Sequence, residues 1–421
     1  MPSVSGGTPH TPGAGGAPSR TGDRGIQPEG MEPSSYVRCE VDRATKAPEP
    51  VIRTGAHRLL LLPSMGDMLD TFLADIAQAQ RRVMVETYIF ADDKMGQLVS
   101  DALVAAAKRG VPVRLLFDPL GSQKTKAEFF DELRGQGLEV RAYREPSPLW
   151  VGKQDFPRDH SRVMVVDEHA FTGGAAWADP WLPKERGGHG WHDVCVQVRG
   201  PCVDDFAALF DRRWAEAQGE PLDVIDFGTG DRYPDLELVA DTPAKLNLVY
   251  DRHRAAIQRA TRRVWIENAY FFPPPDLLHD LYEAAQRGVD VQLILPGETD
   301  LPIVTRAARS EYRDWMEHGL TLFEYQQCVL HSKFALVDDD WCTVGTFNCN
   351  PTSVNFANEV NVFVFHPAFV ARVAELFEAD RAVSRRIDER FLAERGVVDQ
   401  TIDQLAADAL NVVDRLAGPS R

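Results

Sequence analysis

Residues 329–361, VLHSKFALVDDDWCTVGTFNCNPTSVNFANEVN, contain a dense set of reactive side chains. His331 and Lys333 precede the apolar run 334–337, which is typical of a buried β-strand. Side chains two residues apart on a strand point to the same face, so we expect this imidazole and this ammonium group to project together. Alone, such a pair is more often a structural histidine beside a solvated lysine, so the functional interpretation needs further support.

The same stretch continues with polar side chains after a second predicted strand. The apolar run 341–344 ends at Gly345, and Thr346 and Asn348 follow with a hydroxyl and an amide. Glu359 lies 28 residues beyond the histidine. Donors placed around a nucleophile or an acid can stabilise an oxyanion, so the stretch predicts chemistry at an anionic centre.

An earlier part of the chain repeats this order of residues. Residues 158–167 read RDHSRVMVVD and place His160 two positions before Arg162. FTGGAA over 171–176 follows, and then Asp193, 33 residues beyond His160. The repetition favours a functional interpretation over a structural one.

The segments around the two copies repeat as strand, helix and strand. The offset between matched positions falls from 181 at Arg81 and Arg262 to 166 at Asp193 and Glu359, as insertions and deletions in a duplicated unit produce. Strands that alternate with helices predict an α/β sandwich with a largely parallel sheet in each half. The matched elements are strands 81–90 and 262–272, helices 98–109 and 277–287, strands 111–117 and 289–295, and helices 203–214 and 370–391.

These motifs resemble the H-x-K-x4-D signature of the phospholipase D superfamily, with its downstream G-[S/T]-x-N and N-E elements. Over residues 50–395 the chain is most similar to bacterial cardiolipin synthases that lack transmembrane helices. The resemblance implies two similar phospholipase D-like α/β/α sandwich halves, packed as a pseudo-twofold pair with the active site between them. We divide the chain into a disordered tail rich in Pro, Gly and Ser (1–47), a first half (48–218), a linker (219–241), a second half (242–395) and a C-terminal helical extension (396–421).

The resemblance also implies roles for individual residues. His160 is expected to be the nucleophile and His331 the general acid and base, although the sequence is symmetric on this point. Asp193 and Glu359 look like the carboxylates that hold the tautomer of the imidazole preceding each of them, His160 and His331, and stabilise its cation. The phosphate-binding residues are expected to be Arg162, Lys333, Thr346 and Asn348, and the structural residues of the motifs Asp167, Asp338, Gly173, Gly174 and Gly345.

Two positions of the first motif depart from the family pattern. Arg162 stands where lysine is usual; guanidinium also binds phosphate, but its planar fork needs a different site. Ala176 stands where an asparagine would supply a donor, and the loss of one preorganised donor typically lowers a rate by about 10²–10³. The expected activity is transfer of a phosphatidyl group through a phosphohistidine to phosphatidylglycerol or a related alcohol. The alternatives are a phospholipase D hydrolase that releases phosphatidic acid, and a catalytically weakened lipid-binding relative.

Aromatic residues near the motifs leave two interpretations open. Tyr88, Tyr270 and Tyr325 fall near the expected site, although core packing is the more common role for at least two of them. The tryptophans near the first motif could line an acyl-chain rim or pack loops; they are Trp150, Trp177, Trp181 and Trp191. His189 and His192 are weak candidates for metal ligands, so we expect no metal and no other cofactor.

The amino-acid composition limits the kinds of molecule that we expect the protein to bind. With 63 acidic and 46 basic residues the formal charge is −17, which disfavours nucleic acid as a partner and also a nuclease of the same superfamily. Six cysteines without metal spacing suggest free thiols in a reducing compartment. No apolar run is long enough to span a bilayer. We therefore expect a cytoplasmic protein that acts on a phospholipid, in peripheral contact with the inner face of the membrane.

Overall fold

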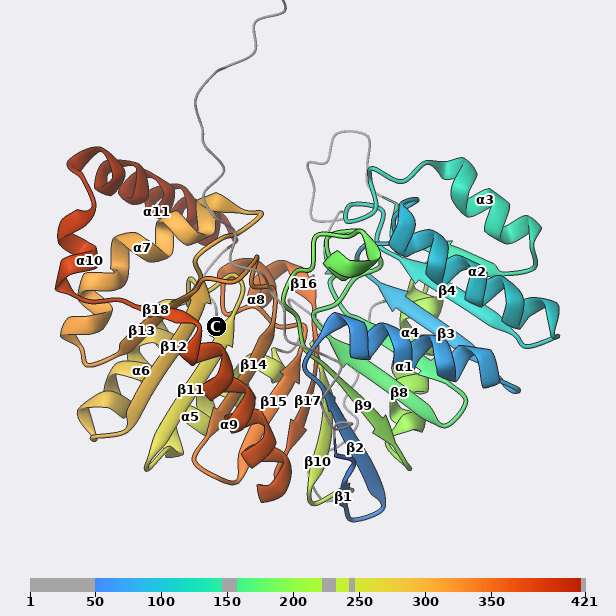
Figure 1. The fold of residues 1–421 in the computed structure, drawn as a ribbon, viewed down its shortest axis with the longest axis horizontal. Helices are drawn as coiled ribbons and strands as arrows, with labels where there is room; N and C mark the ends of the chain where they lie inside the picture. Colours follow the sequence, from blue (N-terminus) through green and yellow to red (C-terminus); the bar gives the residue numbers. More distant parts are fainter. Residues whose placement is uncertain (1–49, 146–156, 222–231, 242–246, 418–421) are drawn as a thin grey trace, which may run out of the picture. The chain divides into compact units, whose positions relative to one another are not determined.

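The computed structural model describes residues 50–145, 157–221, 232–241 and 247–417. All of them belong to one compact unit, residues 39–421. The predicted tail, 1–47, and Trp150 lie outside the described residues. Two eight-stranded sheets form the frame of the unit, and helices cover both faces of each sheet (Figure 1).

The first sheet has the strand order β1-β2-β9-β8-β7-β3-β4-β5. Only the pairs β3–β4 and β4–β5 are parallel. The strands are β1 (Ile52–Thr54), β2 (His57–Leu62), β3 (Val83–Thr87), β4 (Val113–Phe117), β5 (Glu139–Ala142), β7 (Val163–Val166), β8 (His169–Gly173) and β9 (Cys195–Arg199).

The second sheet repeats this arrangement in the order β10-β17-β15-β14-β11-β12-β13-β18. Again only two pairs, β11–β12 and β12–β13, are parallel. The strands are β10 (Leu236–Ala240), β11 (Arg263–Asn268), β12 (Asp290–Pro296), β13 (Thr321–Tyr325), β14 (Lys333–Val337), β15 (Trp341–Gly345), β17 (Val360–Val364) and β18 (Ser384–Arg386).

The prediction of a largely parallel sheet in each half is therefore wrong. Parallel pairing needs a long crossover, and a helix supplies it only where β3, β4 and β5 follow one another, and likewise β11, β12 and β13. The motif strands β7 and β8 are joined by a tight turn, as are β14 and β15, and such turns make antiparallel neighbours. Both motifs lie in the antiparallel part of their sheets.

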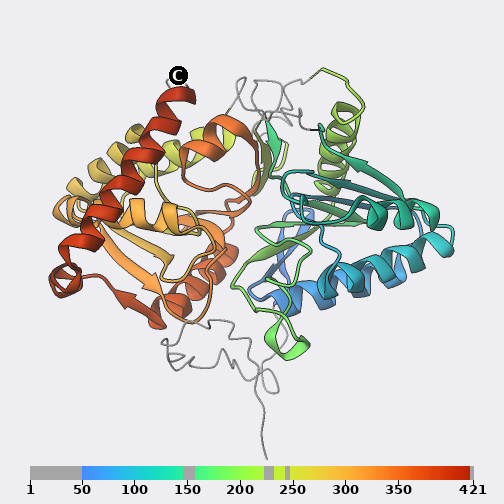
Figure 2. The ribbon, with the colours of Figure 1, turned by 90° about the horizontal axis from the view of Figure 1, so that it is seen from above.

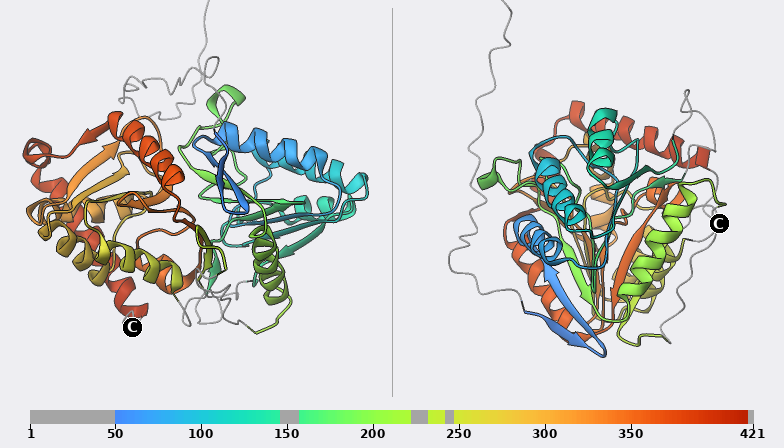
Figure 3. Two further views of the ribbon diagram at one scale, coloured as in Figure 1. Left: turned by 90° about the horizontal axis from the view of Figure 1, so that it is seen from below. Right: turned by 90° about the vertical axis from the view of Figure 1, so that its right-hand side faces the viewer.

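Helices pack on both faces of each sheet, as the sandwich prediction required. Beside the first sheet, α1, α2 and α3 cover one face and α4 the other (Figure 3). Beside the second sheet, α5, α6, α7 and α10 cover one face and α9 the other. The helices are α1 (Met65–Gln78), α2 (Lys94–Lys108), α3 (Ala127–Gly135), α4 (Val203–Glu216), α5 (Leu248–Arg259), α6 (Pro275–Gln286), α7 (Pro302–Glu317), α8 (Pro351–Phe356), α9 (Pro367–Ala382), α10 (Glu389–Glu394) and α11 (Val397–Ala417).

One hydrophobic core joins the two halves. It contains Phe206 and Phe210 of α4 together with Val373 and Phe377 of α9, and inner-face residues of both sheets pack around them. All four side chains are buried, so separating the halves would expose a large apolar area to water. This shared core fixes the two motif strands relative to each other.

Two element boundaries differ from the predictions. Leu236–Ala240, placed in the linker, forms β10 and pairs with β17, so it belongs to the second sheet. The predicted helix 370–391 ends at Ala382, and the chain continues as β18, which pairs with the edge of β13. The C-terminal segment forms α11, which lies along α7 (Figure 2). Among the described residues, no helix combines the length and apolar character that crossing a bilayer requires.

Asp167 and Asp338 occupy matching turns after β7 and β14. Both have a left-handed backbone, with φ of 49° and 50°, which aspartate tolerates better than most residues. Asp338 accepts backbone N–H groups from Thr261, Arg262 and Arg263 at 3.0, 2.8 and 3.1 Å. Asp167 accepts the equivalent three N–H groups before β3. Each carboxylate thus ties the turn of a motif hairpin to the start of the neighbouring strand.

We expect Asp338→Ala to lower the free energy of unfolding by about 2–3 kcal/mol, because it removes several hydrogen bonds to a charged acceptor. Asp338→Asn should cost less, because asparagine tolerates the same backbone and keeps one acceptor. Burial opposes ionisation, but the backbone N–H groups outweigh it and lower the pKa of Asp338. The carboxylate therefore stabilises the fold above its unfolded pKa, and this contribution is lost as the pH falls through the folded pKa.

Urea unfolding at pH 7 and at pH 3 measures these differences. Asp340→Ala, on an exposed residue of the same turn, serves as the control and should change stability by less than about 0.5 kcal/mol. Equal stability of Asp338→Ala and the parent at pH 7 would contradict the structural role.

Candidate active site

Each motif histidine pairs with a carboxylate from the other half of the protein. His160 Nδ1 lies 3.0 and 3.1 Å from the two carboxylate oxygens of Glu359. His331 Nδ1 lies 2.7 Å from Asp193 Oδ2. The pairs join residues 199 and 138 positions apart in the sequence. Because the carboxylates hold Nδ1, Nε2 of each ring is the nitrogen available for chemistry.

This crossing corrects the sequence prediction, which assigned each carboxylate to the histidine that precedes it. The backbone explains the exchange. The two-stranded sheet of β16 (Ala357–Asn358) and β6 (Arg158–Asp159) pairs the segment before Glu359 with the segment before His160. An isolated bridge between His192 and Leu330 does the same for the other pair. Each half therefore places its carboxylate beside the motif histidine of the other half.

Different donors hold the two carboxylates. Glu359 accepts hydroxyl hydrogen bonds from Thr346, at 2.5 Å, and from Ser353, at 2.6 Å. Asp193 accepts from the indole N–H of Trp181 at 2.8 Å. Gly174 occupies the position equivalent to Thr346, and a side chain there would meet the carboxylate of Asp193, since its Cβ would lie 2.4 Å from Oδ1.

The hydroxyl of Thr346 is thus committed to Glu359, and it also accepts the backbone N–H of Val360 at 2.9 Å. The sequence had assigned this hydroxyl to the phosphate; in the structure it orients a carboxylate. Asn348 is buried, and its Oδ1 has no hydrogen-bond partner within the described part of the chain. Ala176, its counterpart in the first half, is fully buried in an apolar cluster, so no polar side chain replaces the missing amide at that position.

Two buried cations lie beside the imidazoles. Lys333 Nζ is 3.0 Å from His331 Nδ1 and 5.5 Å from the centre of the Tyr270 ring. Arg162 donates to the carbonyl of His160 and lies 5.7 Å from the centre of the Tyr88 ring. The Arg162 Nε atom has no hydrogen-bond partner among the described residues. Both cations are 2 % exposed, and both act electrostatically on both histidines, so the site is shared by the halves.

Burial and charge shift the pKa values in the site. Burial and the nearby Lys333 ammonium lower the pKa of His331 to about 4. Burial, with Arg162 and Lys333, lowers the pKa of His160 well below its usual value. Burial also lowers the pKa of Lys333 to about 7 and raises that of Glu359 to about 8, against the hydroxyl donors Ser353 and Thr346. Near pH 7 both rings are therefore neutral, as a nucleophilic imidazole must be.

Four residues lie near the histidines, and the sequence had placed two of them, Tyr88 and Tyr270, near the expected site. Trp181 and Ser353 hold the carboxylates, although nothing in their spacing indicated it. Tyr88 and Tyr270 lie edge-on to His160 and His331, with ring centres 5.2 and 5.6 Å apart. The matched positions of the two tyrosines after the repeated strands were the available signal. Trp177 packs in the core, while Trp181 and Trp191 lie 4.9 and 5.8 Å from the His331 ring.

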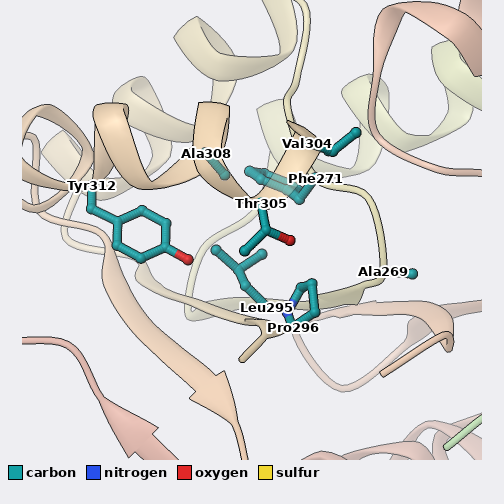
Figure 4. Close-up of a pocket in the computed structure, with 8 residues that line it drawn as sticks. All are labelled: Ala269, Phe271, Leu295, Pro296, Val304, Thr305, Ala308 and Tyr312. Carbon is teal, nitrogen blue, oxygen red and sulfur yellow. The ribbon is translucent and has the colours of Figure 1, made fainter. Parts of the chain in front are cut away.

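Ala269 and Phe271, the sequence neighbours of Tyr270, line a small apolar recess (Figure 4). None of the motif residues lines it. Its polar atoms include the hydroxyl of Tyr312, which is bound to Glu324, and that of Thr305. The lining consists of Ala269, Phe271, Leu295, Pro296, Val304, Thr305, Ala308 and Tyr312. The recess is therefore separate from the imidazole site.

We expect Lys333→Met to raise the pKa of His331, because it removes the cation that opposes protonation of the ring. An NMR titration of protein labelled with ¹⁵N at histidine measures this shift, with signals assigned through His331→Asn. His253 is the internal control: burial also lowers its pKa to about 4, but it packs among aromatic residues, including Trp341 and Phe363. Equal shifts of both histidines, or none at His331, would contradict the assigned cause.

Comparison with known proteins agrees with this geometry. The family model described as "Cardiolipin synthase, PLD-like domain" matches residues 72–214 and 254–381, one match in each half. Cardiolipin synthase B of Escherichia coli (strain K12) is 33 % identical over 367 residues, which cover 82 % of this chain and 85 % of that protein. Cardiolipin synthase 2 of Bacillus cereus is 30 % identical over 323 residues, or 75 % of this chain, and the match spans 63 % of that longer relative.

A solved structure shares the fold. The phosphatidylserine synthase of Haemophilus influenzae Rd KW20 superposes with a TM-score of 0.66 at 14 % identity, over 87 % of this chain and 96 % of that one. The duplicated α/β fold is therefore that of phospholipase D-like proteins. On the family match and the sequence identity, this chain belongs to the phospholipase D superfamily and, within it, to the family of cardiolipin synthases with PLD-like domains.

Proposed function

We propose that this protein is a phosphatidyltransferase that moves a phosphatidyl group from one alcohol to another through a phosphohistidine. The observation that carries the proposal is the pair of crossed imidazole–carboxylate contacts, flanked by Arg162 and Lys333. Two neutral rings, each held at Nδ1 by a carboxylate and lying beside two cations, suit a two-step displacement at phosphorus. Membership of the cardiolipin synthase family supports phosphatidylglycerol as the substrate.

In the first step, Nε2 of His160 attacks phosphorus and the bond from phosphorus to the leaving alcohol oxygen breaks. His331, in its protonated form, gives a proton to that oxygen. In its carboxylate form Glu359 stabilises the positive charge that develops on His160; burial raises the pKa of Glu359 to about 8, and its hydroxyl donors Thr346 and Ser353 oppose that shift. The choice of His160 as nucleophile comes from the family resemblance, because the geometry itself is nearly symmetric.

In the second step, the incoming alcohol gives its proton to His331, its oxygen attacks phosphorus, and the bond between phosphorus and nitrogen breaks. With phosphatidylglycerol as the acceptor the product is cardiolipin; with water it is phosphatidic acid. Arg162 and Lys333 neutralise the phosphoryl charge in both steps, without need of a metal in this scheme. Asn348 is the remaining donor on the motif loop.

Phosphate binding should also change the protonation of the site. In the empty site His331 has a pKa of about 4 and Lys333 one of about 7, mainly through burial. An anionic phosphodiester close to both groups favours their charged forms and raises both pKa values. Substrate thus prepares the acid that its own reaction requires. Above pH 7 the empty site increasingly loses the Lys333 charge, so substrate binding should weaken at alkaline pH.

Because its proposed substrate resides in membranes, the protein should also meet the membrane surface. We infer peripheral contact, with release by high salt or carbonate. Recovery only in detergent would contradict this inference.

The first functional test is product formation. Expression of the full chain in a host that lacks cardiolipin should restore cardiolipin, detected by mass spectrometry of extracted lipids. Purified protein with phosphatidylglycerol vesicles should form the same product equally fast with and without EDTA. His160→Asn should abolish it, whereas His169→Asn, on a histidine of β8 outside the site, should not.

The outcomes separate the alternatives. Phosphatidic acid without cardiolipin would identify a hydrolase. Binding of lipid by the parent and by His160→Asn alike, without turnover, would identify a lipid-binding relative. Loss of activity in EDTA that a divalent cation restores would contradict the metal-free scheme.

The roles of the two histidines can be tested by trapping the phosphoenzyme. Acid-quenched reactions with lipid labelled with ³²P in the phosphate should leave label on the protein, because the first step forms a bond from phosphorus to nitrogen. His331→Asn should retain more label than His160→Asn, since the nucleophile is then still present. The opposite pattern would exchange the two roles.

A further inference from the structure

A second cluster of buried polar side chains lies next to the His331 pair. His192 Nε2 is 3.1 Å from Asp380 Oδ2 and 3.5 Å from Glu267 Oε1. The Tyr325 ring stacks on the imidazole, with centres 5.0 Å apart and planes inclined by 15°. The side chains of His192, Glu267 and Asp380 are 12, 0 and 8 % exposed. The catalytic scheme above uses none of these groups.

This cluster is connected directly to the site. His192 precedes Asp193, and neighbouring side chains on an extended segment point to opposite sides. One side of the dipeptide therefore contacts the His331 ring and the other contacts Glu267 and Asp380. Its backbone is also hydrogen-bonded to the segment that precedes β14. His192 donates its N–H to the carbonyl of Val329 at 2.9 Å and accepts the N–H of His331 at 2.8 Å.

Ser332 connects the cluster to the segment that carries His331 and Lys333. It lies between the two motif residues His331 and Lys333, and its hydroxyl donates to Glu267. Glu267 thus contacts both the dipeptide that supplies the carboxylate and the strand that supplies the imidazole. A displacement in this cluster would move the two partners of the His331 pair relative to each other.

In the first half, different residues lie beside the corresponding pair, His160 and Glu359. Asn358 precedes Glu359, donates from its amide to the Tyr143 hydroxyl at 2.9 Å, and accepts the backbone N–H of His160 at 3.1 Å. The buried cation there is Arg213 of α4, which donates to Glu216 at 3.0 Å. When Val203 of α4 is aligned with Val370 of α9, as in the sequence repeat, Arg213 corresponds to Asp380. The second half therefore has the anion Asp380 at the position where the first half has the cation Arg213.

We propose that His192 is a positioning residue whose imidazolium replaces the missing cation and holds Asp193 and His331 in register. Its effect on turnover rests on the proposed function; its effect on the protonation of His331 does not. Two buried carboxylates at one position repel each other and resist burial unless a cation lies between them. His192 is the cation that reaches both.

The surroundings favour a proton on His192 over a metal ion. Burial lowers the pKa of His192, but the charges and hydrogen bonds of Asp380 and Glu267 outweigh it and raise that pKa well above 6.5. The Nε2–Oδ2 separation of 3.1 Å is within hydrogen-bond distance, so a proton on Nε2 joins His192 directly to Asp380. Since the folded pKa is raised, the contact stabilises the protein fully below the unfolded pKa of histidine, and this contribution is lost as the pH rises through the folded value.

The test compares the parent with His192→Asn, which copies the residue found at this position in the first half. We expect kcat for lipid transfer to fall about tenfold to 100-fold, the usual effect of removing a residue that orients a reacting one, with little change in KM. Burial and Asp380 already raise the pKa of Glu267 to about 7, so removing the imidazolium leaves chiefly the Asp380 carboxylate unbalanced behind the site, and the pKa of His331 measured by NMR should rise. The control is His169→Asn, which breaks a 2.7 Å contact between His169 of β8 and Asp75 of α1. It should change neither kcat nor the pKa of His331.

A second variant separates charge balance from packing. In His192→Asn/Asp380→Asn the unpaired charge of Asp380 is also removed, so the pKa of His331 should return toward that of the parent and part of kcat should recover. In the parent, the ¹⁵N spectrum at pH 7 should show both ring nitrogens of His192 protonated, a measurement that needs no variant. An active parent with a neutral His192, or an unchanged His331 pKa in His192→Asn, would overturn the proposal.

Two further results bear on the proposal. A metal ion that copurifies with the parent, depends on His192 and restores activity after chelation would overturn it in favour of a metal site. If the parent shows no lipid transfer, the proposed function fails, but the NMR readouts of His192 and His331 still decide the positioning role.

Discussion

The contact of each imidazole with a carboxylate from the opposite half is the constraint on which the rest of the structure depends. Within the described part of the chain, neither motif histidine pairs with a carboxylate of its own half. The halves must therefore meet with an accuracy of a few tenths of an ångström, because hydrogen bonds weaken steeply with distance and angle. The shared core around α4 and α9 supplies that accuracy, since close-packed interiors resist small displacements.

Burial is the second requirement, and it acts against the charges that the chemistry needs. Arg162, Lys333, Asp193 and Glu359 all lie almost completely out of solvent. Taking such groups out of water is costly unless each is paired, and the site achieves this through donors and alternating charges. The same burial keeps both imidazoles neutral and would strengthen their interaction with a phosphate group. The anionic substrate that we propose would balance the charges of the two buried cations.

The two halves have kept a common geometry while changing the residues that produce it. Thr346 orients Glu359 with a hydroxyl, whereas its counterpart Gly174 leaves room for Asp193, which the indole of Trp181 holds instead. Arginine and lysine occupy equivalent positions, each beside a tyrosine ring. Conserved chemistry at a pseudo-twofold site thus requires equivalent positions of reacting atoms, not equivalent supporting side chains.

The sequence alone determined the duplication, the sandwich layers and the membership of the site, because these depend on local patterns and on reactive residues in a fixed order. His160, Arg162, His331 and Lys333 were identified from their spacing on predicted strands, and Asp193 and Glu359 from their matched places in the two copies. Sheet direction was predicted incorrectly because alternation of strands and helices was extended to motif strands that are joined by short turns. That error came from the pattern chosen, not from missing information.

Only the tertiary structure decided which carboxylate serves which histidine. Both pairings satisfy the same sequence, and the choice depends on how β16 pairs with β6 and how His192 bridges to Leu330. Trp181, Ser353 and the His192 cluster were likewise beyond reach, because their contacts join segments that no periodic pattern relates. Long-range pairing is set by the packing of the two halves, and one sequence read along its length carries no direct record of that packing.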